Sequence, residues 1–362
     1  MKRIAIIGTR GIPAKYGGFE TLAEHLSLNL DKKISLSVYC PKSDKKNYNG
    51  KFNNTKLIYI NAKANGLQSI FYDIFSIIDA TFFKKHSVLL ILGTSGSIVI
   101  PIIKLFSKVK IIINIDGLEH KREKWNPFAK RMLKWFEKIA IKYSDEIITD
   151  NMIIKEYVKV IYNKDSHFIA YGGDHAFKLP LQDSIKQRFH LPHKYAFKVC
   201  RIEPENNIEL ILNAFCSFNG YPLIIIGNWN SSKYSRMLKS KYSTHKNLII
   251  LDAIYDYQIL NQIRSNCYIY IHGHSAGGTN PSLVEAMSLG LPIIAFDVSY
   301  NRATTMNEAR YFRNNNELKD LLNNVSCTQY STIGAKMLSI AKEKYTWEKI
   351  SKQYYKVLTL NK

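Results

Sequence analysis

The sequence has few cysteines and few acidic residues for its length. Its 362 residues include five cysteines, and 29 aspartates and glutamates stand against 51 lysines and arginines. The cysteines are scattered, odd in number and form no Cys-x-x-Cys pair. This pattern argues against a disulfide scaffold and favours a reducing cytoplasmic compartment.

Several signatures of chemistry are also missing. The chain has no P-loop, no zinc signature, no Ser-His-Asp order, and no RNP or helix-turn-helix pattern, so we expect no nucleic-acid partner. The glycines after the first strand do not form Gly-x-Gly-x-x-Gly, which leaves a nicotinamide-dependent oxidoreductase as a weak alternative. His272 and His274 lack a third metal ligand, so we expect hydrogen-bonding imidazoles and no metal.

A long apolar run is absent as well. Residues 87–103 carry no charge, but Gly93-Thr-Ser-Gly96 and Pro101 interrupt them. The run is shorter than the roughly 20 apolar residues that a span requires. We therefore expect a buried strand at 88–92, a loop and a helix. The N-terminal apolar run is likewise too short for a signal peptide.

The excess of positive charge is large. The net charge is +22, which favours a polyanionic partner, and an anionic membrane surface fits best. Residues 67–83 are apolar nearly all round and precede Lys84-Lys85. They predict either a helix at the inner face of the cell membrane or an ordinary packed surface helix. Lysines on a solvated surface, or a basic scaffold without catalysis, are the alternatives.

The chain length suits two domains. Apolar runs alternate with helical patterns through two series, which is typical of doubly wound parallel α/β sheets. The expected strands are 2–7, 34–39, 57–60, 88–92, 109–115, 145–149 and 164–170, then 195–200, 222–226, 248–251, 267–271 and 292–296. Pro180 and Pro192 mark a linker between the series.

The second series is organised around one strand–loop–helix stretch that begins at His272. Its loop contains Gly273, Gly277 and Gly278, which allow a ligand close to the backbone. Either Thr279 or Asn280 caps the helix that follows. Free N–H groups and the dipole at such a helix start favour a phosphate. Glu285, about one and a half turns into the helix, is placed to accept hydrogen bonds from ribose hydroxyls.

The first series has candidate site residues at its strand ends. The long loop after the first strand includes Arg10, Tyr16 and the pair Gly17-Gly18, an anion-ready nest at a helix start. Asp116 follows a strong strand, with Glu119 and Arg122 close behind in the sequence. Asp116 is the first candidate for a catalytic carboxylate. Its rivals, at two later strand ends, are Asp150 and Tyr171.

These motifs resemble the retaining family-4 glycosyltransferases of GT-B fold. The loop Arg201-Ile-Glu-Pro-Glu-Asn-Asn is similar to the family segment whose Arg and Lys grip the donor diphosphate, with Asn206 in place of the Lys. The family's first glutamate falls on Gly277 here, and its second on Glu285. The phrases Gly-Thr-Arg-Gly-Ile-Pro-Ala-Lys-Tyr-Gly-Gly-Phe-Glu and His-Gly-His…Gly-Gly-Thr-Asn-Pro-Ser resemble a narrower subgroup, the bacterial rhamnosyltransferases of capsule, O-antigen and cell-wall polysaccharide synthesis.

The resemblance implies two Rossmann-like domains facing a cleft. The acceptor domain is expected at 1–178, with a C-terminal helix at 345–362 packing back on it, and the nucleotide-sugar domain at 190–344. The donor-binding positions that it implies are Arg201, Asn206, Asn207, Ala253, His272, His274, Gly277, Gly278, Thr279, Asn280, Ser282, Leu283 and Glu285.

The implied activity is transfer of L-rhamnose from dTDP-β-L-rhamnose, with retention and most simply in β-1,4 linkage. The acceptor is expected to be a lipid-pyrophosphate-linked saccharide. No cofactor or metal is expected, since the fold holds the diphosphate without one. A UDP-hexose donor remains open as an alternative.

Overall fold

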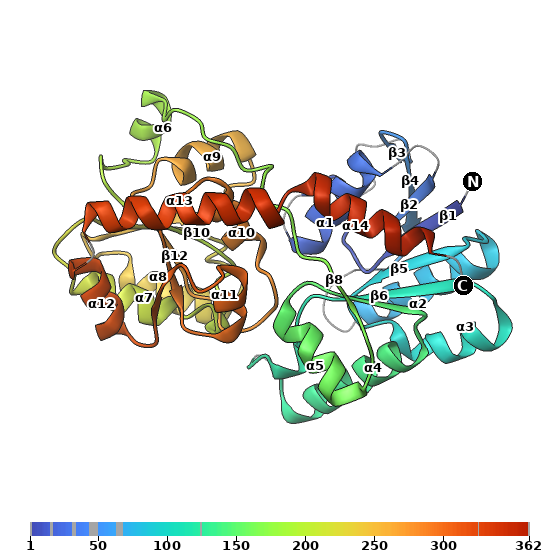
Figure 1. The fold of residues 1–362 in the computed structure, drawn as a ribbon. Coiled ribbons are helices and arrows are strands. Elements are labelled where there is room, and N and C mark those ends of the chain that lie inside the picture. The colour runs from blue at the N-terminus through green and yellow to red at the C-terminus, as the bar shows by residue number, and fades with distance from the viewer. Residues whose placement is uncertain are drawn as a thin grey trace. The chain divides into compact units, whose positions relative to one another are not determined.

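A computed structural model describes residues 2–14, 17–30, 34–42, 50–62, 68–123, 125–324 and 326–360, without the side chain of Cys327. The chain divides into two compact units, Met1–Tyr171 with Trp347–Lys362 (unit 1), and Gly172–Thr346 (unit 2). Each unit has a parallel sheet with helices on its faces (Figure 1). The expected fold class, two Rossmann-like α/β domains, is confirmed.

Unit 1 has an eight-stranded sheet in the order β3-β4-β2-β1-β5-β6-β7-β8, parallel except for the β3–β4 pair. Its chain steps outward one way from β1 and then the other way from β5, so the switch in direction lies between these strands. Every residue of β5 and β6 is buried, as expected for strands covered on both faces. The strands are β1 (Lys2–Ile7), β2 (Ile34–Pro41), β3 (Lys51–Phe52), β4 (Thr55–Ile60), β5 (Val88–Leu92), β6 (Lys110–Ile115), β7 (Glu146–Thr149) and β8 (His167–Phe168).

The helices of unit 1 are α1 (Gly18–Asn29), α2 (Gln68–Ile78), α3 (Ile100–Phe106), α4 (Pro127–Tyr143), α5 (Met152–Tyr162) and α14 (Trp347–Thr359). The single helix expected over 67–83 changes character within its described part, because α2 gives way to a π-helical turn at Asp79–Phe83. At this point the Tyr39 hydroxyl donates to Asp79 Oδ2 at 2.7 Å. The tether fixes Asp79 where the helix widens.

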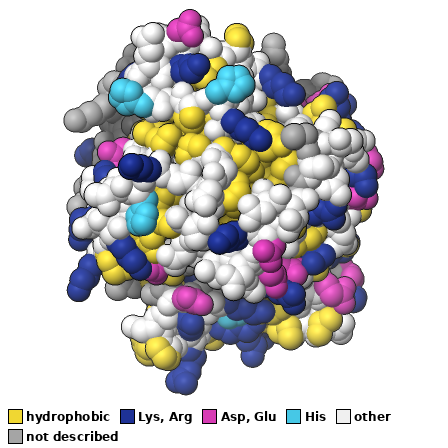
Figure 2. All heavy atoms as spheres, turned by 90° about the vertical axis from the view of Figure 1, so that its left-hand side faces the viewer, with side chains coloured by type: hydrophobic (Ala, Val, Ile, Leu, Met, Phe, Trp, Pro, Cys, Tyr) yellow, Lys and Arg dark blue, Asp and Glu magenta, His cyan; other side chains and the backbone are white. Residues whose placement is uncertain are grey.

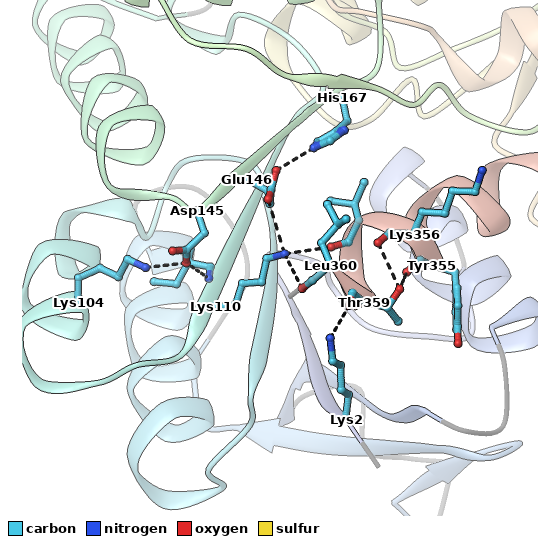
Figure 3. A network of polar contacts seen from close by, with 12 residues as sticks. Lys2, Lys104, Lys110, Asp145, Glu146, His167, Tyr355, Lys356, Thr359 and Leu360 are labelled. Carbon is cyan, nitrogen blue, oxygen red and sulfur yellow. Dashed lines mark hydrogen bonds and ion pairs between the residues drawn. The ribbon is translucent and has the colours of Figure 1, made fainter. Parts of the chain in front are cut away.

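The helix α14 returns to unit 1 after the whole of unit 2. Its Trp347 stacks on His25 of α1 at 4.2 Å. Lys110 of β6 donates to the Leu360 carbonyl at 3.1 Å, and Lys2 of β1 donates to the Thr359 carbonyl at 2.5 Å (Figure 3). Lysines at these last carbonyls also complement the negative end of the helix dipole.

Unit 2 has a six-stranded, fully parallel sheet in the order β11-β10-β9-β12-β13-β14. Its strands are β9 (Ala196–Val199), β10 (Leu223–Gly227), β11 (Leu248–Asp252), β12 (Ile269–His272), β13 (Ile293–Phe296) and β14 (Arg310–Phe312). Its helices are α6 (Asp183–Arg188), α7 (Ile208–Cys216), α8 (Lys233–Tyr242), α9 (Tyr257–Ser265), α10 (Pro281–Ser288), α11 (Ser299–Thr304), α12 (Asn315–Asn324) and α13 (Cys327–Lys344).

The division between the units falls after Tyr171, earlier than residue 178. The segment that follows is bonded within unit 2: the Gly173 N–H donates to the Tyr345 carbonyl at 2.8 Å, and the Leu179 N–H to Ser265 Oγ at 3.2 Å.

Two surface features bear on partners. Among the described helices, none combines the length and apolar character needed to cross a bilayer. Figure 2 shows one face on which dark-blue lysines and arginines are spread widely around a yellow apolar area. This distribution agrees with the net charge of +22.

Candidate functional site

The centre of the unit 2 sheet is a topological switch point. β9 and β12 pair there, with Tyr270 opposite Phe197, and the strand order runs away from them in both directions. Ligands of open α/β sheets bind beyond the carboxyl ends of the strands at such a point. Two loops leave it, residues 200–207 after β9 and residues 273–280 after β12.

Hydrogen bonds join these two loops. The Asn206 amide donates to the Arg201 carbonyl at 2.6 Å, and the Asn207 amide donates across to the Gly273 carbonyl at 2.8 Å. A Cβ on Gly273 would lie 2.3 Å from the Asn206 carbonyl oxygen, so only glycine fits there. Asn206 and Asn207 therefore shape the rim of the site.

Asn280 caps α10, which decides between the two expected caps. Its side chain accepts from the Ser282 N–H at 3.1 Å and from the Ser282 hydroxyl at 2.7 Å, while Thr279 is buried. The Leu283 N–H donates to the Asn280 carbonyl, and the Leu283 side chain lies in the core. The backbone donors of Ser282 and Leu283 are thus used within the turn.

Gly277 departs from the family pattern for a reason visible in its backbone. Its φ is +123°, and no atom of the described residues lies within 4 Å of the position where a Cβ would stand. A glutamate would be strained in this conformation. Gly278 follows it, and the Asn301 amide anchors the start of the loop by donating to the His274 carbonyl at 2.9 Å. The loop therefore leaves open space where the family has a carboxylate.

Glu285 lies in a buried ionic network. Its Oε1 is 2.9 Å from His175 Nε2, and its Oε2 accepts from Arg264, which also donates to Asn261 at 2.7 Å. Burial opposes ionisation of Glu285, but the Arg264 charge and these hydrogen bonds prevail and hold its pKa at about 2. Both oxygens already have partners, so a ribose hydroxyl would have to share the remaining lone pairs.

Two polar side chains lie buried under the loops. Lys198 of β9 is 1% exposed, and within the described chain its ammonium has no hydrogen bond or ion pair. His272, the last residue of β12, is fully buried and stacks on His274 at 4.5 Å between ring centroids. Burial lowers the pKa of Lys198, and burial with the nearby Lys198 charge lowers that of His272.

The remaining donor candidates lie at the carboxyl edge of the same sheet. The Arg201 side chain is 54% exposed, with its Nη1 4.0 Å from Glu203, so it can turn toward an anion. Ala253 follows β11, which lies two strands from β9.

The acceptor candidates of unit 1 gather where β6, β7 and β8 end. Asp116 is half-buried, whereas Asp150 and Tyr171 are almost wholly buried. Burial, and then the charges of Asp116 and Asp150, raise the Tyr171 pKa well above its usual value. Tyr354 of α14 joins the group and accepts a hydrogen bond from Asn114. Its own pKa is raised by burial and by the same two aspartates.

Glu119 and Arg122 bind each other. Arg122 Nε lies 2.8 Å from Glu119 Oε1, and Trp125 donates to Glu119 Oε2 at 3.2 Å. This pairing holds the loop after β6 in shape.

Acidic side chains bind the loop after β1. The Arg10 N–H donates to Glu20 Oε1 at 2.9 Å, and the Ala14 N–H donates to Glu24. Glu20 Oε2 lies 2.0 Å from where a Cβ on Gly17 would be, and Gly18 begins α1. Glu20 therefore lies against the start of α1, where the sequence predicts binding of an external anion. Tyr16 lies outside the described residues.

Sequence reasoning missed Lys198, Arg264, His175 and Tyr354. Lys198 had a usable signal, since it interrupts the apolar run of a central strand. Arg264, His175 and Tyr354 belong to no motif and reach their partners only through the fold.

Two family models match consecutive parts of the chain. Residues 1–174 match the family described as "Domain of unknown function (DUF1972)", and residues 182–325 match "Glycosyl transferases group 1". A curated relative, the probable sucrose-phosphate synthase of Thermosipho melanesiensis, is 24% identical over 241 residues. That match covers 61% of this chain and 56% of the relative, so the chain spans little more than half of the relative's length.

Solved structures match over nearly the whole chain. The sucrose-phosphate synthase of Thermosynechococcus elongatus has a TM-score of 0.82 at 15% identity, covering 99% of this chain and 98% of that one. Anabaena HepE in complex with UDP has a TM-score of 0.75 at 12% identity, covering 99% and 100%. Together with the two sheets, these likenesses define a GT-B fold. The match to the group 1 glycosyltransferases lies within unit 2 and covers residues 182–325.

Proposed function

We propose that this protein is a retaining glycosyltransferase that takes a sugar from a nucleoside diphosphate donor bound at the switch point of unit 2. The observation that carries the proposal is the pair of joined loops after β9 and β12, inside the segment matched to the group 1 family. Arg201, whose side chain is exposed, supplies cationic donors to a leaving diphosphate, and the start of α10 adds its dipole. No metal is assigned to the reaction.

The proposed donor is dTDP-β-L-rhamnose. The sequence resemblance supports it, and so does the open space at Gly277, because a 6-deoxy sugar does without one polar contact. A UDP-hexose is the second candidate, favoured by the likeness to Anabaena HepE, whose structure has been determined with UDP-glucose.

The donor is tested by measuring hydrolysis and transfer with dTDP-rhamnose, UDP-glucose and a GDP-sugar, beside thermal shifts with dTDP, UDP and NAD. We expect turnover of dTDP-rhamnose and stabilisation by dTDP. Turnover of UDP-glucose alone would select the second candidate. Stabilisation by NAD alone would indicate an oxidoreductase, and no response to any nucleotide would indicate a scaffold.

We propose that Asp116 binds the acceptor hydroxyl, which belongs to a lipid-pyrophosphate-linked saccharide. It is half-buried and therefore reachable, whereas Asp150 and Tyr171 are shielded. A carboxylate that orients and deprotonates the hydroxyl is worth about a hundredfold or more in rate. We expect Asp116→Asn to lose this factor while donor binding survives. Loss of turnover only in Asp150→Asn or Tyr171→Phe would move the role to them.

We also propose peripheral attachment to the inner face of the cell membrane through α2 and the turn after it. Phe71, Phe75 and Phe83 are 59%, 53% and 74% exposed, and exposed Lys84 and Lys85 follow. Aromatic side chains with basic neighbours suit an anionic interface. Co-sedimentation with anionic vesicles should fall when Phe71 and Phe75 are changed to serine, and should fall with salt. No binding by the wild type at low salt would contradict it.

A further inference from the structure

The donor site has an unmet electrostatic requirement. A nucleoside diphosphate brings at least two negative charges, and the family's gripping lysine is Asn206 here, with its amide bonded to the Arg201 carbonyl. The N–H groups of Ser282 and Leu283 are already used inside the turn. Arg201 alone supplies one positive charge, which does not balance the two or more negative charges of a leaving diphosphate.

A buried cation lies at this same place. Lys198 Nζ is 2.9 Å from where a Cβ on Gly273 would stand, so the ammonium reaches the carboxyl edge of the sheet, beneath the joined loops. His272 of the adjacent strand is close enough for its pKa to be lowered by the Lys198 charge. Both side chains are buried, and within the described chain neither has a hydrogen-bond partner.

Such a lysine costs stability. Natural interiors pair their buried charges, because removing an ion from water without a partner costs several kcal/mol. Its titratable neighbours His272 and Cys200 do not offset this cost, because neither supplies a negative charge. Burial keeps the imidazole of His272 neutral and raises the pKa of the Cys200 thiol. A side chain maintained at this cost, at the ligand edge of the sheet, indicates an anion that comes from outside the chain.

We propose that Lys198 is the buried cation of the donor site, and that its ammonium provides a counter-charge for the diphosphate of the bound nucleotide. It takes the place of the lysine missing at position 206, approaching the diphosphate from the sheet. The uncharged imidazole of His272 positions the aliphatic part of the Lys198 side chain. The inference rests on the proposed function, because it requires a nucleoside diphosphate at the switch point.

The test compares the wild type with Lys198→Met and with Lys336→Met. Lys336 is an exposed lysine of unit 2, paired with Glu308, and controls for loss of general positive charge. Melting temperature without ligand and the Kd for dTDP and UDP are measured for each. Methionine matches the lysine stem in length and packs well in a core. We expect Lys198→Met to melt at a higher temperature and yet to bind the diphosphate about 10- to 100-fold more weakly. We expect Lys336→Met to lower the melting temperature only slightly and to leave the Kd values unchanged.

A gain in melting temperature together with a loss of nucleotide affinity distinguishes the proposed role from a structural one. A lysine with a merely structural role would give a lower melting temperature in Lys198→Met, and unchanged Kd values would also overturn the inference. Absence of dTDP and UDP binding in the wild type would overturn the proposed function, and this inference with it. Should the variant fail to fold, calorimetry of the wild type in buffers of different ionisation enthalpy, repeated from pH 7 to 10, decides: proton uptake on dTDP binding within this range supports the role of Lys198, and none across the range opposes it.

Discussion

The two units place opposite charges at the same topological position. Both sheets switch direction at their centre, between β1 and β5 in unit 1 and between β9 and β12 in unit 2. In unit 1 the loop after the first of these strands is bound by Glu20 and Glu24, carboxylates of its own chain. In unit 2 the corresponding loops cover the ammonium of Lys198, for which the described residues supply no hydrogen-bond partner.

This difference in charge shows that strand order alone does not determine which ligand a sheet binds. A switch point creates a crevice in either sheet, but the side chains beneath it decide what enters. In unit 1, carboxylates of the chain itself already bind the described part of the loop, which disfavours an anionic ligand there. An uncompensated cation favours an anionic ligand in unit 2. The predictions below test this contrast, beginning with the largest expected effect.

Glu285→Gln should destabilise unit 2 by about 3–5 kcal/mol, because it leaves the buried Arg264 without its carboxylate partner. Hydrogen exchange resolved by region should show faster exchange in α9 and α10 and little change in unit 1. The double change Glu285→Gln with Arg264→Met is the control and should recover part of the loss. An unchanged exchange pattern would mean that the network is not fully formed in solution.

Gly8→Ala should destabilise unit 1 by roughly 3 kcal/mol. Gly8 has φ +95°, and its Cβ would lie 2.1 Å from the Leu92 carbonyl oxygen, where β1 and β5 end together. The matched control is Gly50→Ala in the same unit. Gly50 has a positive φ, but its Cβ would have no atom of the described residues within 4 Å. Equal losses in the two variants, measured by chemical denaturation, would refute the steric explanation.

Asp73→Asn should stabilise unit 1 by up to about 4 kcal/mol at pH 8 and hardly at pH 4. Burial raises the Asp73 pKa to about 7 from an unfolded value near 3.8. The folded state therefore binds an extra proton between these values, and stability falls as pH rises through them. Melting curves from pH 4 to 8 should slope less in the variant. Parallel slopes would show that Asp73 is not buried as described.

Exposed ion pairs should not distinguish the units. Lys104 with Asp145 in unit 1 and Lys336 with Glu308 in unit 2 both have 2.6 Å separations and partly exposed side chains. Lys104→Met and Lys336→Met should each cost under about 1 kcal/mol, and less still in high salt. A loss well above that in one unit alone would show that surface charge contributes to the contrast between them.

The fold was largely predictable, because its central strands are continuous apolar runs. Val88–Leu92 was predicted with its exact bounds, and the cap and first turn of α10 follow from Asn280 and Pro281. The β8 strand was overestimated, since only His167–Phe168 pair with β7. An apolar pattern indicates a buried segment but does not reveal where its neighbour ends.

The candidate site was predictable only where its residues are local in sequence. The glycine, asparagine and arginine residues in the loops after β9 and β12 indicate from the sequence that these loops bind a ligand. The partners of Glu285 could not be predicted, because His175 and Arg264 lie 110 and 21 residues away in the chain. Both meet Glu285 through packing. The same holds for Tyr354, which reaches Asn114 across 240 residues.

The return of α14 to unit 1 has a consequence for biosynthesis. The contacts of Lys2, His25, Lys110 and Asn114 with residues 347–360 wait until those residues have left the ribosome. By then residues 172–346 have already emerged, so unit 2 can fold on the ribosome while unit 1 still lacks a helix. Unit 1 is therefore completed only after unit 2 has been synthesised, and its catalytic candidates Asp116 and Asp150 gain Tyr354 as a neighbour only then.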